Sequence, residues 1–423
     1  MVYLTALGTD ILIVNNHQAA IDLLEHMGIF FSNRPHFTMI GELCGFNRLP
    51  AISSDGASPR LRALRRALNS EIGAKTVSAY ESTVEECCKV YIAKQNCSPN
   101  EFREHIQWYV LSICYGLETS SNQDPYIMLS QKIMHRLSQD AKPGKWIVDL
   151  FPLLRLLPEW FPGLSFKTYA KIIHSELNDW VTRPFELVKN QKPTTHSFCR
   201  QLMDSFEEWS PEQEDIVIWS AASMYSAGTD TTVSALSTFY LAMVHFPDVQ
   251  RKAQQEIALR FPGEKGDKHC LTFRDCNELQ YVHAILLEVL RWGSTLPLGA
   301  PRETTDTIIY KGYEIPPGCI VLVNIWGICH DPHLYSNPGR FCPERFLGDH
   351  PQPNPWSCVF GFGRRICPGR YLAERTLMVA IANILANFYI TAVDGETPPI
   401  EYDDGFISHP KPFLCSIVPL SAH

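Results

Sequence analysis

Apolar residues recur every three or four positions along most of the first 290 residues, which predicts a largely helical chain. The predicted helices span residues 59–72, 77–93, 101–117, 126–139, 166–190, 210–245, 247–261 and 273–292. Asn16 precedes a further amphipathic segment that ends at Gly28, and we expect it to cap a short helix there.

Short strands are predicted at both ends of the chain. The opening residues read as a hairpin, Tyr3 to Leu7 and Ile11 to Val14, with a turn at Gly8-Thr9. After Pro297, strands are expected at 307–310, 313–315 and 320–325, and one more helix follows a loop over 331–366. The pattern predicts a mainly α fold with a minor β portion. No linker divides residues 1–423, so we expect a single domain.

Two further segments change the picture. Residues 31–59 form a predicted loop rich in Gly, Pro and Ser yet carrying apolar side chains, and long loops in compact domains are often functional. Residues 376–393 are apolar enough to suggest a membrane span. They contain Asn383 and Asn387, however, so a buried core helix is the better interpretation.

Composition excludes several classes of protein. The chain is 45% hydrophobic and 19% charged, which argues against disorder, and its net charge of −8 leads us to expect no nucleic-acid partner. Its 14 cysteines include no C-x-x-C pair, so a zinc ribbon or an iron–sulfur cluster has no support.

The most informative segment runs from Phe360 to Gly369 and reads Phe-Gly-Phe-Gly-Arg-Arg-Ile-Cys-Pro-Gly. Cys367 precedes a predicted helix start, where the helix end and nearby Arg365 are expected to lower the thiol pKa. A thiolate on a glycine-lined loop suits an axial ligand to haem iron. The alternative is a buried structural cysteine in an ordinary turn.

This segment resembles the haem-binding signature of the cytochrome P-450 superfamily, in which a cysteine thiolate holds the iron. The resemblance runs in order from Phe31 to the C-terminus and favours a eukaryotic, fungal-like member. It implies the cytochrome P-450 fold, a helical bundle around buried haem b (iron protoporphyrin IX). It also implies Cys367 as the metal ligand, with Phe360, Gly363 and Gly369 in the cofactor-binding loop.

A second motif, Glu288-Val289-Leu290-Arg291, places a carboxylate and a guanidinium on one helix face. Such pairs also occur by chance on surface helices and contribute little there. Beside the cysteine motif, it resembles the family's E-x-x-R element, and Pro343-Glu344-Arg345-Phe346 resembles its P-E-R-F element. The resemblance implies a buried structural network of Glu288, Arg291 and Arg345 that locks the loop behind the haem.

A third motif, Ala227-Gly228-Thr229-Asp230-Thr231-Thr232, lies within a long helical pattern. Small residues let a flat cofactor approach, and a mid-helix threonine can bond back to a carbonyl; a polar kink in a core helix is the alternative. The motif resembles the family's oxygen-activation element. Asp230 and Thr231 would then be the catalytic acid and alcohol that relay protons to dioxygen. Relatives that only rearrange peroxides tend to lack this pair.

Arginines are the expected partners of the two haem propionates. Arg365 and Arg302 match family positions, and Arg65 matches the second arginine of a Trp-Arg-x-x-Arg element in which Leu61 replaces the usual Trp. The alternative for the basic helix around Arg65 is a solvated face or a docking surface for a reductase.

The resemblance predicts a haem-thiolate monooxygenase that inserts one atom of O2 into a lipophilic small molecule. NADPH-cytochrome P-450 reductase would supply the electrons. By family analogy, the substrate belongs to secondary metabolism and resembles a terpenoid or polyketide. The alternatives are a haem-binding pseudo-enzyme without turnover and an isomerase or dehydratase of the same fold, which would need no reductase. The expected pocket segments are 31–59, 142–165, 219–225, 296–300 and 406–408.

The N-terminal hairpin resembles the first hairpin of family members that carry a membrane anchor, a Pro-rich hinge and a helix before it. We therefore expect those segments to be missing, either by truncation or in a natural short form. The family is usually attached to the endoplasmic reticulum, which keeps a membrane surface among the candidate partners, while the localisation of this chain is left unassigned.

Overall fold

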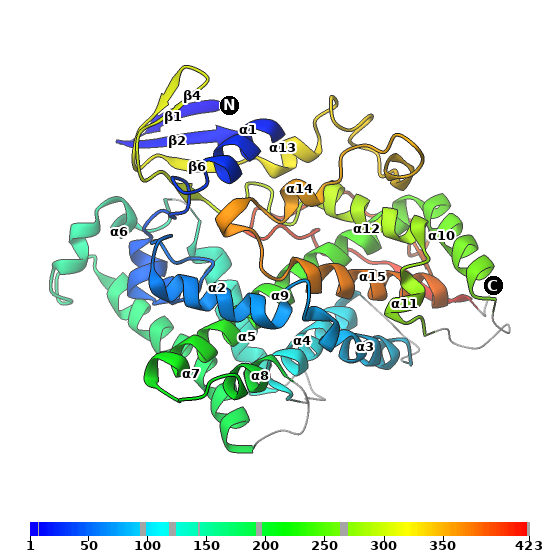
Figure 1. Cartoon of the computed structure of the whole chain (residues 1–423), viewed down its shortest axis with the longest axis horizontal. Coiled ribbons are helices and arrows are strands. Elements are labelled where there is room, and N and C mark those ends of the chain that lie inside the picture. Colours follow the sequence, from blue (N-terminus) through cyan, green and yellow to red (C-terminus); the bar gives the residue numbers. More distant parts are fainter. Residues whose placement is uncertain are drawn as a thin grey trace.

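The computed structural model describes residues 1–6, 8–93, 99–117, 124–142, 144–191, 197–262 and 270–420. A four-stranded sheet at the N-terminal end lies beside a larger helical part, as Figure 1 shows. The predicted mainly α fold with a minor β portion is confirmed.

The predicted N-terminal hairpin is present, apart from Leu7, which lies outside the described residues. Strand β1 (Val2–Ala6) pairs antiparallel with β2 (Thr9–Val14), and β2 pairs in parallel with β6 (Ile320–Val323). Strand β3 (Arg302–Glu303) completes this sheet against β6. The remaining strands form two small sheets: β4 (Ile308–Tyr310) with β5 (Tyr313–Ile315), and β7 (Phe388–Thr391) with β8 (Ser416–Pro419).

Helix α1 (His17–Ile21) starts where the sequence predicts, because the Asn16 side chain accepts a hydrogen bond from the Ala19 amide. It continues as a π-helical turn, η1 (Asp22–His26). The loop over 31–59 contains a second π-helical segment, η2 (Thr38–Leu43), and a 3-10 turn, η3 (Phe46–Arg48).

The larger helices follow the predicted spans closely. They are α2 (Pro59–Ile72), α3 (Glu81–Ala93), α4 (Pro99–Tyr115), α5 (Pro125–Asp140), α7 (Ser165–Gln191), α9 (Pro211–His245), α10 (Pro247–Arg260), α12 (Gln280–Gly293) and α15 (Arg370–Asn387). Short helices and 3-10 turns lie between them: η4 (Val77–Tyr80), α6 (Ile147–Leu150), η5 (Pro152–Leu156), α8 (Phe198–Asp204), α11 (Phe273–Cys276), α13 (Ile325–Cys329), η6 (Pro343–Phe346), α14 (Trp356–Val359) and η7 (Gly363–Arg365).

Two helix predictions were wrong in detail. The predicted helix over 273–292 is two helices, because α11 ends at Cys276 and α12 begins anew at Gln280. The predicted core helix over 376–393 ends at Asn387, and the chain continues as strand β7. Its interior is buried from Thr376 onward, as expected. Among the described residues, none of the helices combines the length and apolar character needed to span a bilayer.

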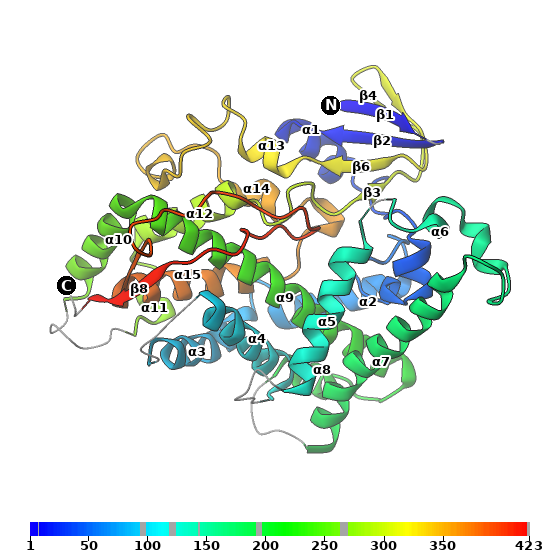
Figure 2. The ribbon, with the colours of Figure 1, turned by 180° about the vertical axis from the view of Figure 1, so that it is seen from behind.

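Helix α9 forms the centre of the helical part and packs against α2, α4, α12 and α15. Ser210 starts it with a capping box, in which its hydroxyl accepts from the Gln213 amide and the Gln213 side chain accepts from the Ser210 amide. In Figure 2, the C-terminal segment runs along α9 toward the sheet. The helix therefore contacts elements from both ends of the sequence.

Candidate functional site: a cysteine loop and a buried arginine cluster

Cys367 lies on a loop that is closed by its own backbone. The Cys367 amide donates to the Phe360 carbonyl at 2.8 Å, and the Ile366 amide donates to the Gly363 carbonyl at 3.1 Å. Helix α15 begins three residues later, with Gly369 as its N-cap. Cys367 as a whole residue is partly exposed. The loop therefore presents one sulfur beside the start of a long buried helix.

The expected effect of Arg365 on Cys367 was wrong. Burial raises the pKa of the Cys367 thiol, and this outweighs the lowering by the Gly369 amide and by the positive charges of Arg65 and Arg370. Arg365 instead points away and donates to the carbonyls of Ser32, Pro50 and Ser53. Coordination to a metal cation deprotonates a thiol outright, so the thiolate here depends on a bound cation.

The glycines around Cys367 differ in the contacts that require a residue without a side chain. Gly361 and Gly363 both adopt positive φ angles, of 77° and 51°. A Cβ at Gly363 would lie 2.2 Å from the carbonyl oxygen of Leu24, so packing against η1 already requires glycine there. At Gly369, a Cβ would lie 4.0 Å from the Cys367 sulfur. Proximity to the expected haem ligand can therefore explain glycine at 369, whereas packing against η1 explains it at 363.

The three arginines expected at the haem propionates lie in one cluster, together with Arg34. Arg65 donates to the Ile366 carbonyl at 2.8 Å, and Arg302 donates to the carbonyls of Phe362 at 2.7 Å and Phe31 at 3.2 Å. Arg34, Arg302 and Arg365 are each less than a tenth exposed. Within the described ranges, none of these four guanidiniums forms an ion pair with Asp or Glu.

This clustering of like charge lowers the arginine pKa values. Burial lowers the pKa of Arg302 to about 9, with contributions from the positive charges of Arg365 and Arg65. Burial lowers the pKa of Arg365 to about 10, again helped by Arg65 and opposed by the negative charge of Asp55. The pKa of Arg34 lies well below its ordinary value, because of burial first and then the positive charges of Arg302, Arg365 and Arg65. Buried positive charges that outnumber the carboxylates near them are costly, so the cluster fits a ligand with carboxylate groups.

Sequence reasoning missed Arg34 as a member of this cluster. Its Nε atom is buried and has no hydrogen-bond partner among the described residues, while its Nη1 donates to the Pro301 carbonyl. The signal was present in Phe31-Ser32-Asn33-Arg34-Pro35, where an arginine lies in a loop that also carries apolar side chains. An unpaired buried donor is an independent observation in favour of an anionic ligand at this place.

The second group of predicted site residues, Asp230 and Thr231, lies on α9 beside Ala227. Ala227 is exposed although α9 is buried on both sides of it. Thr231 bonds back to the Ala227 carbonyl at 2.6 Å, which is the helix-loosening contact expected from the sequence. Asp230 and Thr231 are both partly exposed, and Asp230 also contacts His409, a residue that sequence reasoning missed.

The structure brings Glu288, Arg291 and Arg345 together inside the protein. Arg291 Nε and Nη2 donate to the two Glu288 carboxylate oxygens at 2.7 and 2.8 Å, and Arg345 Nε donates to Glu288 at 3.1 Å. Both residues of the α12 pair are fully buried. The remaining donors reach the carbonyls of Cys329, Ser336, Asn337 and Arg340. The network therefore anchors residues 329–345, reaches Gln352 through Arg345, and makes no direct bond to the Cys367 loop among the residues that the structure describes.

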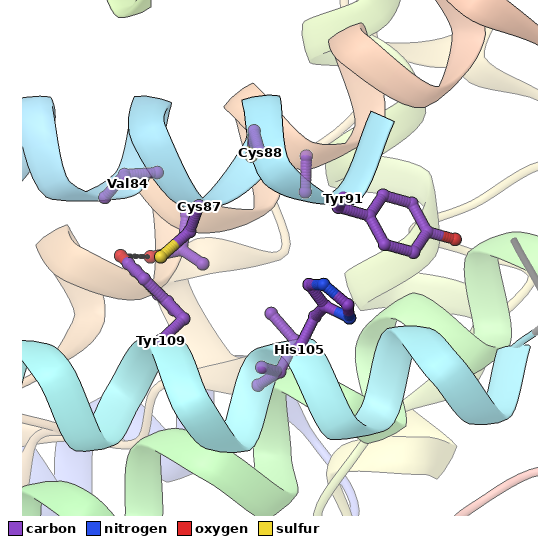
Figure 3. A pocket seen from close by; sticks show the side chains of 9 residues that line it. Val84, Cys87, Cys88, Tyr91, His105 and Tyr109 are labelled. Carbon is purple, nitrogen blue, oxygen red and sulfur yellow. Dashed lines mark hydrogen bonds between the residues drawn. The ribbon is translucent and has the colours of Figure 1, made fainter. Parts of the chain in front are cut away.

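A separate small cavity lies between α3, α4 and α15, as Figure 3 shows. Cys87, Tyr91, His105 and Tyr109 line it, and the Tyr109 hydroxyl lies 2.9 Å from that of Thr376. It leaves about 20 Å³, room for little more than one water molecule. Burial raises the pKa of the Cys87 thiol to about 12, so this thiol stays protonated at neutral pH. The cavity offers no reactive group.

Part of the expected pocket wall is core. Tyr225 is 2% exposed and packs with the rings of Tyr115, Tyr126 and Trp180. Trp219 is buried under the guanidinium of Arg48, 4.3 Å from its ring. Leu298 and Phe406, from two other expected segments, remain exposed. Trp219 and Tyr225, which were expected to line the pocket, are therefore core residues.

Comparison with known proteins decides the family. The sequence profile described as "Cytochrome P450" matches residues 1–417. The chain belongs to the cytochrome P450 family. This P450 is 38% identical to cytochrome P450 monooxygenase 208 of Postia placenta, over 100% of this chain and 84% of that protein. It is 34% identical to tryptamine 4-monooxygenase of Psilocybe cyanescens, over 99% and 85% of the two chains.

A solved structure shares the fold of this P450. The zebra fish cytochrome P450 with abiraterone superposes with a TM-score of 0.77 at 20% identity and covers 99% of this chain and 96% of that one. The fungal relatives confirm the predicted enzyme class, a haem-thiolate P450 monooxygenase with haem b as its cofactor. O2, a small-molecule substrate and a redox partner follow from that class.

Proposed function

We propose that this P450 oxidises a lipophilic small molecule of secondary metabolism, with Cys367 as the thiolate ligand to haem iron. The observation that carries the haem assignment is the cluster of Arg34, Arg65, Arg302 and Arg365, in which Asp55 acts on Arg365 from a distance and every hydrogen bond described for the guanidiniums goes to a backbone carbonyl. Arginine pairs strongly with carboxylates, and haem b brings two propionates. The cluster joins the Cys367 loop through the bond from Arg65 to Ile366.

When bound, haem supplies the oxygen chemistry, and a cysteine ligand favours cleavage of the O–O bond. The protein's own residues then have three tasks. Cys367 donates its sulfur, and the arginines neutralise the anionic groups at the cofactor edge. Asp230 and Thr231 hold and pass protons beside Ala227, where small side chains leave α9 open.

The Thr231 hydroxyl donates to the Ala227 carbonyl, so the lone pairs of its oxygen remain available to accept a hydrogen bond from a donor such as water. Asp230, on the same turn, carries the acidic group. This arrangement of an alcohol and an acid supports a true monooxygenase over a same-fold isomerase.

The substrate class rests on relatives and on apolar lining. Several fungal relatives are P450 monooxygenases, and one is named for oxidation of tryptamine. Leu298 and Phe406, exposed on segments expected to face the pocket, favour an apolar substrate. The classes to screen are terpenoids, polyketide-like compounds and, because of that relative, arylethylamines.

The deciding experiment supplies purified protein with NADPH-cytochrome P450 reductase, NADPH and isotopically labelled O2, and screens these three classes. We expect one labelled oxygen atom in a product. Reductase activity without oxidation of any compound would favour a haem-binding pseudo-enzyme. Conversion of a compound without NADPH would favour an isomerase or dehydratase.

A membrane surface is a second proposed partner. The segment from Leu150 to Trp160 exposes five large apolar side chains, each half or more exposed: Leu150, Phe151, Leu153, Leu156 and Trp160. Such a concentration on one short segment favours contact with an apolar phase. The same contact would bring a lipophilic substrate to the enzyme.

A further inference from the structure

The C-terminal segment runs beside α9 (Figure 2), and side chains of α9 bond to it at several positions along the helix. These contacts are Asp230 with His409, Ser234 with the Ser408 carbonyl, Thr238 with the Tyr402 hydroxyl, and His245 with the Pro398 carbonyl. Of these contacts, the one between His409 and Asp230 involves the carboxylate that we propose relays protons. The others fix the segment in register on the helix.

His409 contacts Asp230 from a rigid loop. Its Nε2 atom lies 3.2 Å from Asp230 Oδ1, and the two side chains are 13% and 28% exposed. The Asp403 amide donates to the His409 carbonyl at 2.9 Å, and the His409 amide donates to the Asp403 carboxylate at 3.1 Å. The neighbouring Ser408 carbonyl accepts from Ser234 at 2.6 Å. The backbone that carries the imidazole is therefore held on both sides.

The surroundings of the other ring nitrogen of His409, Nδ1, indicate which nitrogen carries the proton. His409 Nδ1 is buried and has no hydrogen-bond partner among the described residues. A proton on Nδ1 would be a buried donor without an acceptor, which costs more than an unused lone pair. The proton therefore belongs on Nε2, from which the ring donates to Asp230 Oδ1.

We propose that His409 is a positioning residue for Asp230. This inference rests on the proposed function of Asp230 and Thr231 as the proton relay. The Nε2–H group holds one carboxylate oxygen, so the rotamer of Asp230 is fixed. The other oxygen, Oδ2, makes no hydrogen bond to another described residue and stays available for proton exchange beside Thr231. Without His409, the carboxylate samples other rotamers, and proton delivery slows.

The test compares His409→Ala and His409→Gln with Asp230→Asn and with the double variant of Asp230→Asn and His409→Ala. Glutamine keeps an N–H donor at a similar reach. His245→Ala is the matched control, because it removes a histidine bond from α9 to the same segment, at Pro398, away from Asp230. The carbon-monoxide spectrum of each variant checks that it has folded and holds haem.

The first readout needs no substrate. Dithionite-reduced enzyme is mixed with dioxygen in H2O and in D2O, and the rate of return to the resting spectrum is recorded. We expect a several-fold slower return and an altered solvent isotope effect in His409→Ala. His409→Gln and His245→Ala should stay near the wild type, and the double variant should be no slower than Asp230→Asn alone.

The second readout is independent of turnover. Ring-nitrogen NMR of the diamagnetic carbon-monoxide form, with His409→Gln used for assignment, should find the His409 proton on Nε2 and a shift of that signal in Asp230→Asn. A proton on Nδ1, or an unchanged signal, would overturn the inference. So would a normal rate in His409→Ala while Asp230→Asn is slow. Normal rates in both Asp230→Asn and Thr231→Ala would instead overturn the proposed relay itself.

Discussion

Arg302 and Arg365 are two buried guanidiniums of like charge that share one small region of the protein. The positive charge of Arg365 adds to burial in lowering the pKa of Arg302 to about 9. Arg34 and Arg65 extend the same cluster, and every hydrogen bond described for the four goes to a backbone carbonyl. A ligand with carboxylates would remove the repulsion.

Replacing Arg34 should weaken haem retention. A hydrogen bond to a charged group contributes about 1.5–3 kcal/mol, so Arg34→Gln should speed haem transfer to an apo-globin acceptor by about ten-fold or more. The gain in melting temperature on haem loading should also shrink, because the cluster has less repulsion to relieve. Arg48→Gln, in the same loop but stacked on Trp219, is the control. If both variants retain haem equally well, Arg34 does not bind the propionates.

Cys367 should be required for the thiolate spectrum. Cys367→Ala should lose the red-shifted Soret band of the reduced carbon-monoxide form, because no sulfur remains to donate charge to the iron. Cys342→Ala tests a cysteine whose thiol bonds to Glu344 instead, and it should keep the band. Absorption spectra of both proteins at equal haem content make the comparison. A persistent band in Cys367→Ala would refute the ligand assignment.

Thr231→Ala should uncouple electron consumption from product formation. NADPH oxidation should continue, while peroxide rises and product falls several-fold, because the hydroxyl that orders protons beside Ala227 is gone. Thr231→Ser should restore most of the product. Thr229→Ala removes an equivalent helix bond, from Thr229 to the Tyr225 carbonyl, at a buried position and should have little effect. Product and peroxide are measured per NADPH with a compound that the enzyme oxidises.

Glu288→Gln should severely destabilise the fold. It leaves Arg291 and Arg345 buried without their counterion, and breaking a buried pair typically costs about 3–5 kcal/mol. Lys252→Gln removes the exposed pair of Lys252 with Glu344 and should cost less than about 1 kcal/mol. Denaturant unfolding of both variants measures the difference. Similar midpoints would mean that the buried network contributes no more than a surface pair.

Charging the exposed segment should reduce lipid binding. Burying one large apolar side chain contributes about 1.5–3 kcal/mol, so Leu153→Asp with Trp160→Asp should lower vesicle binding by ten-fold or more. Co-sedimentation with phosphatidylcholine vesicles measures this binding. Leu259→Asp, at an equally exposed position on α10, is the control. If all proteins sediment alike, residues 150–160 are not the lipid contact.

Local sequence determined the elements and the chemistry carried by each. The spacing of apolar residues gave α2 its bounds, Asn16 placed the start of α1, and a separation of three residues put Glu288 and Arg291 on one helix face. These features depend on neighbours a few residues apart, and the ten-residue motif at Cys367 is of the same kind.

Tertiary structure decided which of these groups meet. It set the charge of Arg65, and not that of Arg365, against the Cys367 thiol; it added Arg34 to the charge cluster; and it set His409 against Asp230. It also explained Gly363 by the backbone of Leu24. These contacts join residues far apart in the chain, and packing of whole elements sets their distances, so no local pattern could contain them.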